Sequence, residues 1–195
     1  MDALTVADKF SILGLPKLNV MQSLLLEVRD KQLEGHAAEL GVYRGGVSYL
    51  IANTLTSKHL HMFDTWEGLP STADYTNEYH RPGEFGDIGN WGALDDLRTY
   101  RRVHFHEGIF PGSIPPILDM AKFCFVHLDA DLYDSTKAGL EFFYPKMVKG
   151  GIIVCDDYLW PHCPQIRKAL WEFLADKPEQ IEVRQEFQAI IKKVN

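Results

Sequence analysis

The sequence predicts an α/β fold built around a mostly parallel sheet. From Gly35 onward, short apolar runs alternate with longer amphipathic ones, and a glycine-rich turn follows the first run. Acidic residues directly follow several of the other runs. This alternation is typical of βαβ units. The chain has 195 residues and is 46% hydrophobic, so we expect one domain over residues 1–195.

The apolar runs place the individual elements. We expect strands at residues 36–40, 59–64, 103–106, 123–129 and 151–156. Helices are expected at residues 47–55, 115–120, 135–147 and 165–175. The last shows apolar side chains at helical spacing, and the prolines near 115 suit a first helical turn. Residues 1–35 are expected to form one or two N-terminal helices, and residues 181–194 an antiparallel hairpin that completes a seven-stranded sheet.

Residues 67–92 do not fit the alternation. The segment is rich in glycine and proline among polar and aromatic side chains. A structureless stretch of this length inside a compact domain is usually functional or disordered, and we expect a lid or substrate loop. Acceptor binding and simple surface placement both remain open for its larger side chains, which are Tyr75, Tyr79, His80, Arg81 and Trp91.

The composition excludes several classes of protein. With 27 acidic and 20 basic residues the formal charge is -7, whereas nucleic-acid binding depends on clustered Lys and Arg. We therefore expect a small or cationic ligand and no nucleic acid. No apolar run approaches the ~18 residues of a membrane span, and the three cysteines form no CxxC pair. These features predict a cytoplasmic protein with no membrane partner.

The first predicted strand runs into a glycine-rich turn and then a helix. The turn reads Glu39-Leu-Gly-Val-Tyr-Arg-Gly-Gly46. Its glycines would let the backbone approach a ligand and would leave the N–H groups of the helix free to bind an anionic end of that ligand. The spacing is not G-x-G-x-x-G, which favours another adenosine-type ligand over a pyrophosphate cofactor. A turn that serves only tight packing is the alternative.

Asp64 ends the second predicted strand, 23 positions after Gly41. An acidic residue there is well placed to accept hydrogen bonds from a ribose. An aspartate at the end of a strand is also a common turn residue.

Carboxylates follow the fourth and fifth predicted strands. Asp129 and Asp131 follow the fourth, and Asp156 and Asp157 the fifth. Carboxylates that converge at one edge repel each other unless a cation lies between them, and oxygen ligands suit magnesium. In the alternative, Asp131 and Asp134 cap the next helix and Asp157 is solvated; Asp131 remains open. The strand histidines 104, 106 and 127 are expected to be structural, since a lone strand histidine usually is.

These motifs together resemble a known family. The stretches AELGVYRGG, FDTWEGLP, FVHLDADLYDSTKAGLEFFYP and GGIIVCDDY are similar to those of the macrocin O-methyltransferase family. Its members are class I S-adenosylmethionine-dependent enzymes with a Rossmann-like fold. They methylate hydroxyls, typically on sugars of natural products, with a divalent metal. The resemblance covers most of residues 36–160.

The resemblance implies a role for each matching position. Asp64 would hold the ribose hydroxyls of S-adenosylmethionine, and Asp129 would be both a metal ligand and the catalytic base. The metal, Mg²⁺ or another hard divalent ion, would be bound by Asp129, Asp156 and Asp157. The methionine part of the cofactor would contact Glu39, Gly41, Tyr43 and Gly45. The adenine would lie beside Gly108, Ile109 and Phe110, and Val42, Thr65 and Trp66 are expected to line the same site.

The expected partner is a hydroxylated small molecule, such as a sugar or a glycosylated natural product. The N-terminal region, which shapes the acceptor site and subunit contacts in the family, looks shorter here than in macrolide-modifying members. The substrate therefore stays undecided, and a homo-oligomer is compatible with the sequence. Two alternatives are a nucleotide-dependent oxidoreductase, which lacks its glycine fingerprint here, and a non-catalytic binding protein, against which the intact carboxylates argue.

Overall fold

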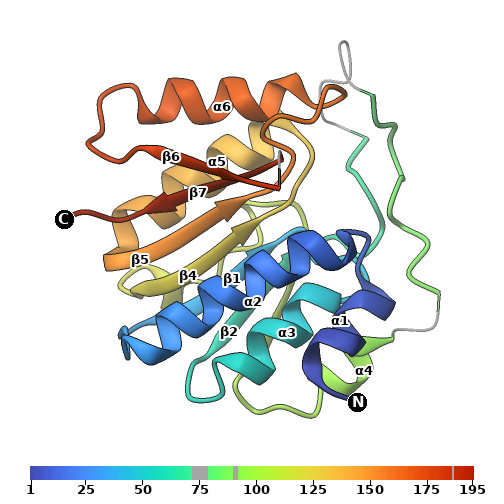
Figure 1. Ribbon diagram of the computed structural model, residues 1–195. Coiled ribbons are helices and arrows are strands. Elements are labelled where there is room, and N and C mark those ends of the chain that lie inside the picture. The colour runs from blue at the N-terminus through green and yellow to red at the C-terminus, as the bar shows by residue number, and fades with distance from the viewer. Residues whose placement is uncertain (72–78, 90–91, 186) are drawn as a thin grey trace.

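The protein is centred on a seven-stranded sheet (Figure 1). The structure, a computed structural model, describes residues 1–71, 79–89, 92–185 and 187–195. The strand order is β3-β2-β1-β4-β5-β7-β6. Strands β1 to β5 run parallel, and β7 is antiparallel to both β5 and β6. The bounds are β1 His36–Leu40, β2 Leu60–Asp64, β3 Val103–Glu107, β4 Phe123–Leu128, β5 Met147–Cys155, β6 Ile181–Arg184 and β7 Gln188–Lys192.

Helices cover both faces of the sheet, so its central strands are apolar on both sides. Helices α1 (Ala3–Phe10), α2 (Gly14–Asp30), α3 (Gly46–Thr54) and α4 (Ala93–Leu97) pack on one face (Figure 1). Helices α5 (Tyr133–Phe143) and α6 (Pro164–Leu174) pack on the other. Adjacent strand residues point to opposite faces: Ala37 joins the first core and Ala38 the second. No helix in the described ranges is long and apolar enough to cross a membrane.

The expected α/β fold is confirmed, including the two N-terminal helices and the C-terminal hairpin. Three local expectations are wrong. Residues 115–120 form only the 3₁₀ turn η1 (Pro116–Leu118), because Pro115 is extended before a second proline. Helix α5 ends at Phe143, because the chain turns through η2 (Tyr144–Lys146) around Pro145. Strand β5 then begins four residues before the predicted start. The short helix α4 was not predicted.

Five histidines share one face of β1, β2 and β3. His61 lies at the centre, 5% exposed, with its ring nitrogens 2.8 Å from His36 Nδ1 and 3.0 Å from His106 Nε2. His59 Nδ1 and His104 Nε2 are also 2.8 Å apart. Burial, followed by the neighbouring imidazoles, lowers the pKa of His61 to about 3. The His61 ring stacks on those of His36, His104 and His106.

The strand order creates a ligand-binding edge. β1 has β2 on one side and β4 on the other. The chain therefore adds β2 and β3 on one side of β1 and then crosses over to add β4 and β5 on the other. In open α/β sheets ligands bind beyond the carboxyl ends of the strands at this switch point.

Candidate active site

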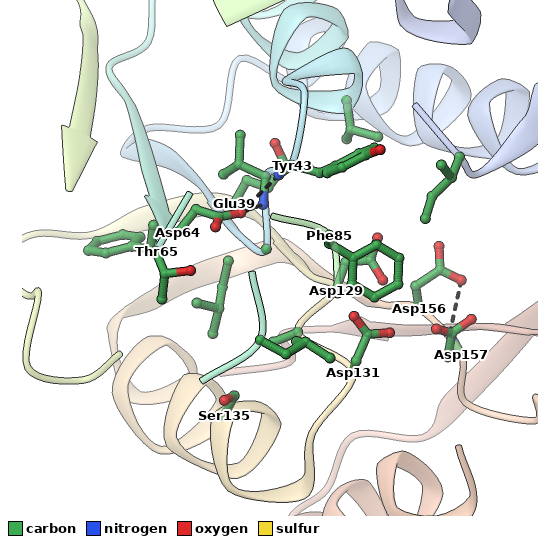
Figure 2. A pocket seen from close by; sticks show the side chains of 18 of the residues that line it. Glu39, Tyr43, Asp64, Thr65, Phe85, Asp129, Asp131, Ser135, Asp156 and Asp157 are labelled. Atoms are coloured by element: carbon green, nitrogen blue, oxygen red, sulfur yellow. Dashed lines mark hydrogen bonds between the residues drawn. The ribbon is translucent and has the colours of Figure 1, made fainter. Parts of the chain in front are cut away.

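A cavity of about 370 Å³ lies at the carboxyl ends of β1, β2, β4 and β5. Its walls come from the turn after β1, the strand ends, the loop after β3, the α1–α2 connection and the segment after β2. Figure 2 shows Asp129, Asp131, Asp156 and Asp157 gathered on one side of it, and Glu39, Asp64 and Thr65 on the other. The fold thus brings both predicted groups of acidic residues to one pocket.

The glycine turn is held in place by close backbone contacts. Gly41 has φ +83°, and a Cβ there would lie 1.8 Å from the Asp129 carbonyl oxygen, so no side chain fits. The Asp64 carboxylate accepts hydrogen bonds from the backbone amides of Val42 (2.6 Å), Tyr43 (2.8 Å) and Trp66 (2.7 Å). Asp64, at the end of β2, therefore holds the glycine turn that follows β1.

Most of the predicted cofactor residues line the cavity. Gly45 and Trp66 are not among its lining residues. Gly45 is the N-cap of α3, and Trp66 packs against Phe105 with ring centroids 5.4 Å apart. The predicted residues that do line it are Glu39, Gly41, Val42, Tyr43, Asp64, Thr65, Gly108, Ile109 and Phe110.

A buried ion-pair chain links the two sides of the pocket floor. His127 Nδ1 lies 2.9 Å from Glu39 Oε1, and the Ser48 hydroxyl donates to the other Glu39 oxygen. His127 Nε2 faces Asp156 Oδ2 at 4.0 Å. Burial alone would lower the pKa of His127, but the carboxylates of Asp156 and Glu39 raise it to about 10. His127 is therefore an imidazolium at neutral pH.

The four aspartates form a tight acidic cluster. One oxygen each of Asp129, Asp131 and Asp157 lie within 4.8 Å of one another. Burial, and then repulsion between the carboxylates, raises the pKa of all three. Burial also opposes ionisation of Asp156, but His127 and Lys17 outweigh it and lower its pKa. Such a cluster favours a bound cation.

The backbone of the cluster is strained. Asp131 and Asp157 have φ values of 59° and 58°, a conformation that non-glycine residues rarely adopt and that tends to occur at functional sites. Leu132 occupies the N-cap position of α5, so neither Asp131 nor Asp134 caps that helix.

Lys17 was missed by the sequence analysis. Its ammonium lies 2.5 Å from Asp156 Oδ1 and 3.4 Å from Asp157 Oδ1. Lys17 belongs to the first turn of α2 and precedes these aspartates by 139 and 140 positions. No local motif marks it, because only the packing of α2 against the sheet brings it to the site.

Described residues of the segment after β2 line the cavity. His80 is 4% exposed, with Nδ1 2.8 Å from Glu84 Oε2 and Nε2 3.5 Å from Asp131 Oδ1. Asp87 contacts the glycine turn by accepting from the Tyr43 hydroxyl at 3.0 Å. The described part of the predicted lid thus touches both halves of the site. Tyr75 and Trp91, two of its predicted residues, lie outside the described residues.

Comparison with known proteins identifies the family of the chain. A sequence model described as Macrocin-O-methyltransferase (TylF) matches residues 5–186. The chain belongs to this family. It is an S-adenosylmethionine-dependent O-methyltransferase, as the sequence motifs predicted, and the oxidoreductase alternative is excluded.

Related proteins agree with this identification. The methyltransferase is 26% identical over 186 residues to demethyldecarbamoylnovobiocin O-methyltransferase of Streptomyces niveus, covering 87% of this chain and 69% of that one. It is also 26% identical over 173 residues to 8-demethyl-8-(2,3-dimethoxy-alpha-L-rhamnosyl)-tetracenomycin-C 4'-O-methyltransferase of Streptomyces olivaceus, covering 78% and 64%. The solved O-methyltransferase NovP shares the fold, with a TM-score of 0.83, 22% identity and coverage of 95% and 83%.

Proposed function

We propose that this methyltransferase transfers a methyl group to a hydroxyl of a sugar or glycosylated natural product, with a divalent metal ion bound by Asp129, Asp156 and Asp157. The observation that carries the proposal is the acidic cluster that lines the cavity. Family membership supports the methyl transfer.

The donor set fits a hard divalent ion. Among the described residues, the buried Asp156 Oδ2 has no hydrogen-bond partner, and a buried polar atom without a partner is costly unless an unseen ligand satisfies it. Carboxylate oxygens suit Mg²⁺, Ca²⁺ or Mn²⁺ rather than softer metals. When bound, such an ion lowers the pKa of a coordinated hydroxyl and orients it.

The residues of the chain align the two substrates and receive the proton. Asp64, fixed by three backbone amides, would present its remaining lone pairs to the ribose hydroxyls. The glycine turn at Gly41 and Tyr43 would hold the methionine part of the cofactor. Asp129 would accept the proton of the acceptor hydroxyl, the role that the resemblance to the family assigns to this position.

The lid side of the cavity suits a sugar ring. Phe85, Trp160 and Phe187 line it beside the acidic cluster, which combines flat apolar surfaces with hydroxyl-binding oxygens. A sugar presents C–H faces to such rings and neighbouring hydroxyls to the cluster. The Streptomyces olivaceus relative, which is named for methylation of a rhamnosyl group, supports this acceptor class.

A turnover screen tests the proposal. S-adenosylmethionine, Mg²⁺ and a panel of sugars and glycosylated compounds are incubated with the protein, and S-adenosylhomocysteine is measured. We expect Asp129→Ala to lower turnover by ~10²-fold or more, the usual scale for a general base, while the Kd for S-adenosylmethionine by calorimetry changes little. Asp134→Ala, at an exposed position of α5, is the matched control. Unchanged turnover in Asp129→Ala would remove Asp129 from the mechanism.

A further inference from the structure

The acidic cluster already contains a positive charge supplied by the chain. The Lys17 side chain is 17% exposed and contacts Asp156, whose side chain is 1% exposed, and Asp157, which is 17% exposed. Two of the three aspartates assigned to the metal are thus partners of one lysine. An amine held in this way satisfies the same oxygens that a divalent ion would need.

The charges argue against both cations binding these oxygens at once. An ammonium ion pair and an inner-sphere metal bond both require direct contact with Asp156 Oδ1 or its neighbours. Two like charges a few ångströms apart repel strongly in a partly buried site, where screening by water is weak. The second positive group, His127, already faces the remaining Asp156 oxygen at 4.0 Å. A metal ion that enters must therefore displace the ammonium.

An aromatic ring lies within reach of a displaced ammonium. Lys17 Nζ lies 5.4 Å from the centroid of the Phe187 ring, within the range of a cation–π contact. The lysine stem is flexible, so the amine could move toward this ring while α2 keeps its position. Phe187 also lines the cavity, so an ammonium that moves toward this ring stays beside the proposed acceptor site.

We propose that Lys17 is the resident counter-cation of the acidic cluster and that a divalent ion binds by displacing its ammonium from Asp156. This inference rests on the proposed metal site. It makes Lys17 a positioning residue that keeps the carboxylates together before the metal arrives and lowers the affinity for that metal. Binding of the metal is then coupled to the position of the Lys17 side chain in the first turn of α2.

Metal binding without turnover tests this inference. Mn²⁺ affinity is measured by electron paramagnetic resonance and Mg²⁺ affinity by calorimetry, on wild type, Lys17→Met and Lys17→Arg. Methionine keeps much of the length without the charge, so we expect Mn²⁺ to bind about tenfold more tightly or better, given the size of charge–charge effects at such distances. Lys17→Arg keeps the charge and should stay close to wild type. Lys9→Met, at an exposed position of α1, is the control.

The wild-type protein provides a second measurement should Lys17→Met fail to fold. Lysine footprinting by mass spectrometry should show Lys17 labelled faster when Mg²⁺ saturates the site, with no change at Lys9. Equal Mn²⁺ affinity in wild type and Lys17→Met, or equal labelling with and without metal, overturns the inference and leaves the proposed metal site standing. Absence of metal binding in every variant, with methyl transfer intact, overturns both the inference and the metal part of the proposed function.

Discussion

Asp129, the proposed catalytic base, is expected to lower the stability of the fold. Its carboxyl is buried beside Asp156 and Asp157, which raises its pKa. The folded protein therefore binds that proton more tightly than the unfolded chain does. At neutral pH, which is above the pKa of this carboxyl in the unfolded chain, its charged form lowers the free energy of unfolding.

We therefore expect Asp129→Asn to be more stable than wild type without metal. One unit of pKa shift corresponds to about 1.4 kcal/mol, so removal of the charge should raise the free energy of unfolding by about 1 kcal/mol or more. Urea denaturation at pH 7.5 in EDTA measures this difference, with exposed Asp134→Asn as the control. Excess Mg²⁺ should reduce the advantage, because the wild-type carboxylate then has a partner. A variant that is less stable than wild type in EDTA would show that repulsion does not dominate at Asp129.

Residues at strand ends could be predicted from the sequence, and their partners from distant parts of the chain could not. Asp64, Asp129, Asp156 and Asp157 follow apolar runs, and parallel pairing brings such positions together whatever the details of packing. Lys17 and the Glu39–His127 pair depend on contacts across 139 and 88 positions. The expected structural role of His127 did not include its charge, because no sequence pattern reveals which carboxylates surround a buried imidazole.

At the scale of elements, the three strands β1, β2 and β3 share a histidine face. Burial and neighbouring imidazoles keep the pKa of His61 at about 3, far below its ordinary value of 6.5. The unfolded chain therefore binds this proton more tightly than the folded protein. The stabilising contribution is complete above pH 6.5 and is lost as the pH falls from there toward 3.

Acid unfolding should reveal this histidine. Between pH 6 and pH 5 we expect the wild-type free energy of unfolding to fall by about 1 kcal/mol through His61 alone. His61→Gln removes the titrating group, so its stability should depend less on pH across this interval. Chemical denaturation at several pH values measures both slopes, and the aspartates contribute equally to the two proteins. Identical slopes would mean that His61 is protonated as easily in the folded protein as in the unfolded chain.

Prolines account for the elements that were predicted with wrong bounds. Pro115 and Pro116 resemble a helix start, but two in succession leave only one 3₁₀ turn. Pro145 ends α5 early, and the Gly150–Gly151 pair concealed the first residues of β5, which continue through both glycines. Local signals thus identified the strands and the longer helices, and they were wrong in type or boundary where proline or glycine permitted two conformations.

For the molecule as a whole, the cavity joins the N-terminal helices, the sheet and the segment after β2. Its lining includes the α1–α2 connection as well as the ends of four strands. A ligand in this position holds together segments that are distant in the chain. Binding to the folded form alone should therefore stabilise the entire domain.

We expect S-adenosylmethionine at 100 times its Kd to stabilise the protein by about 2.7 kcal/mol. For a domain of this size that corresponds to a rise in Tm of about 5–10 °C. Differential scanning calorimetry with increasing cofactor measures the shift, and NAD⁺ is the control because the turn lacks the dinucleotide spacing. An equal shift with NAD⁺, or none with S-adenosylmethionine, would contradict the assignment of the cavity to the methyl donor.

The contact between Gly41 and the Asp129 carbonyl has a consequence for enzyme redesign. The cofactor turn and the acidic cluster meet there through backbone atoms, with no space for a side chain. Substitutions that shift one half therefore shift the other, and neither can be tuned alone. Acceptor preference is better altered at Phe85, Trp160 and Phe187, which line the cavity from the lid and the β5–α6 and β6–β7 connections. Variants changed only at these three positions could be screened for new acceptors, while the proposed methyl donor site keeps its position relative to the carboxylates.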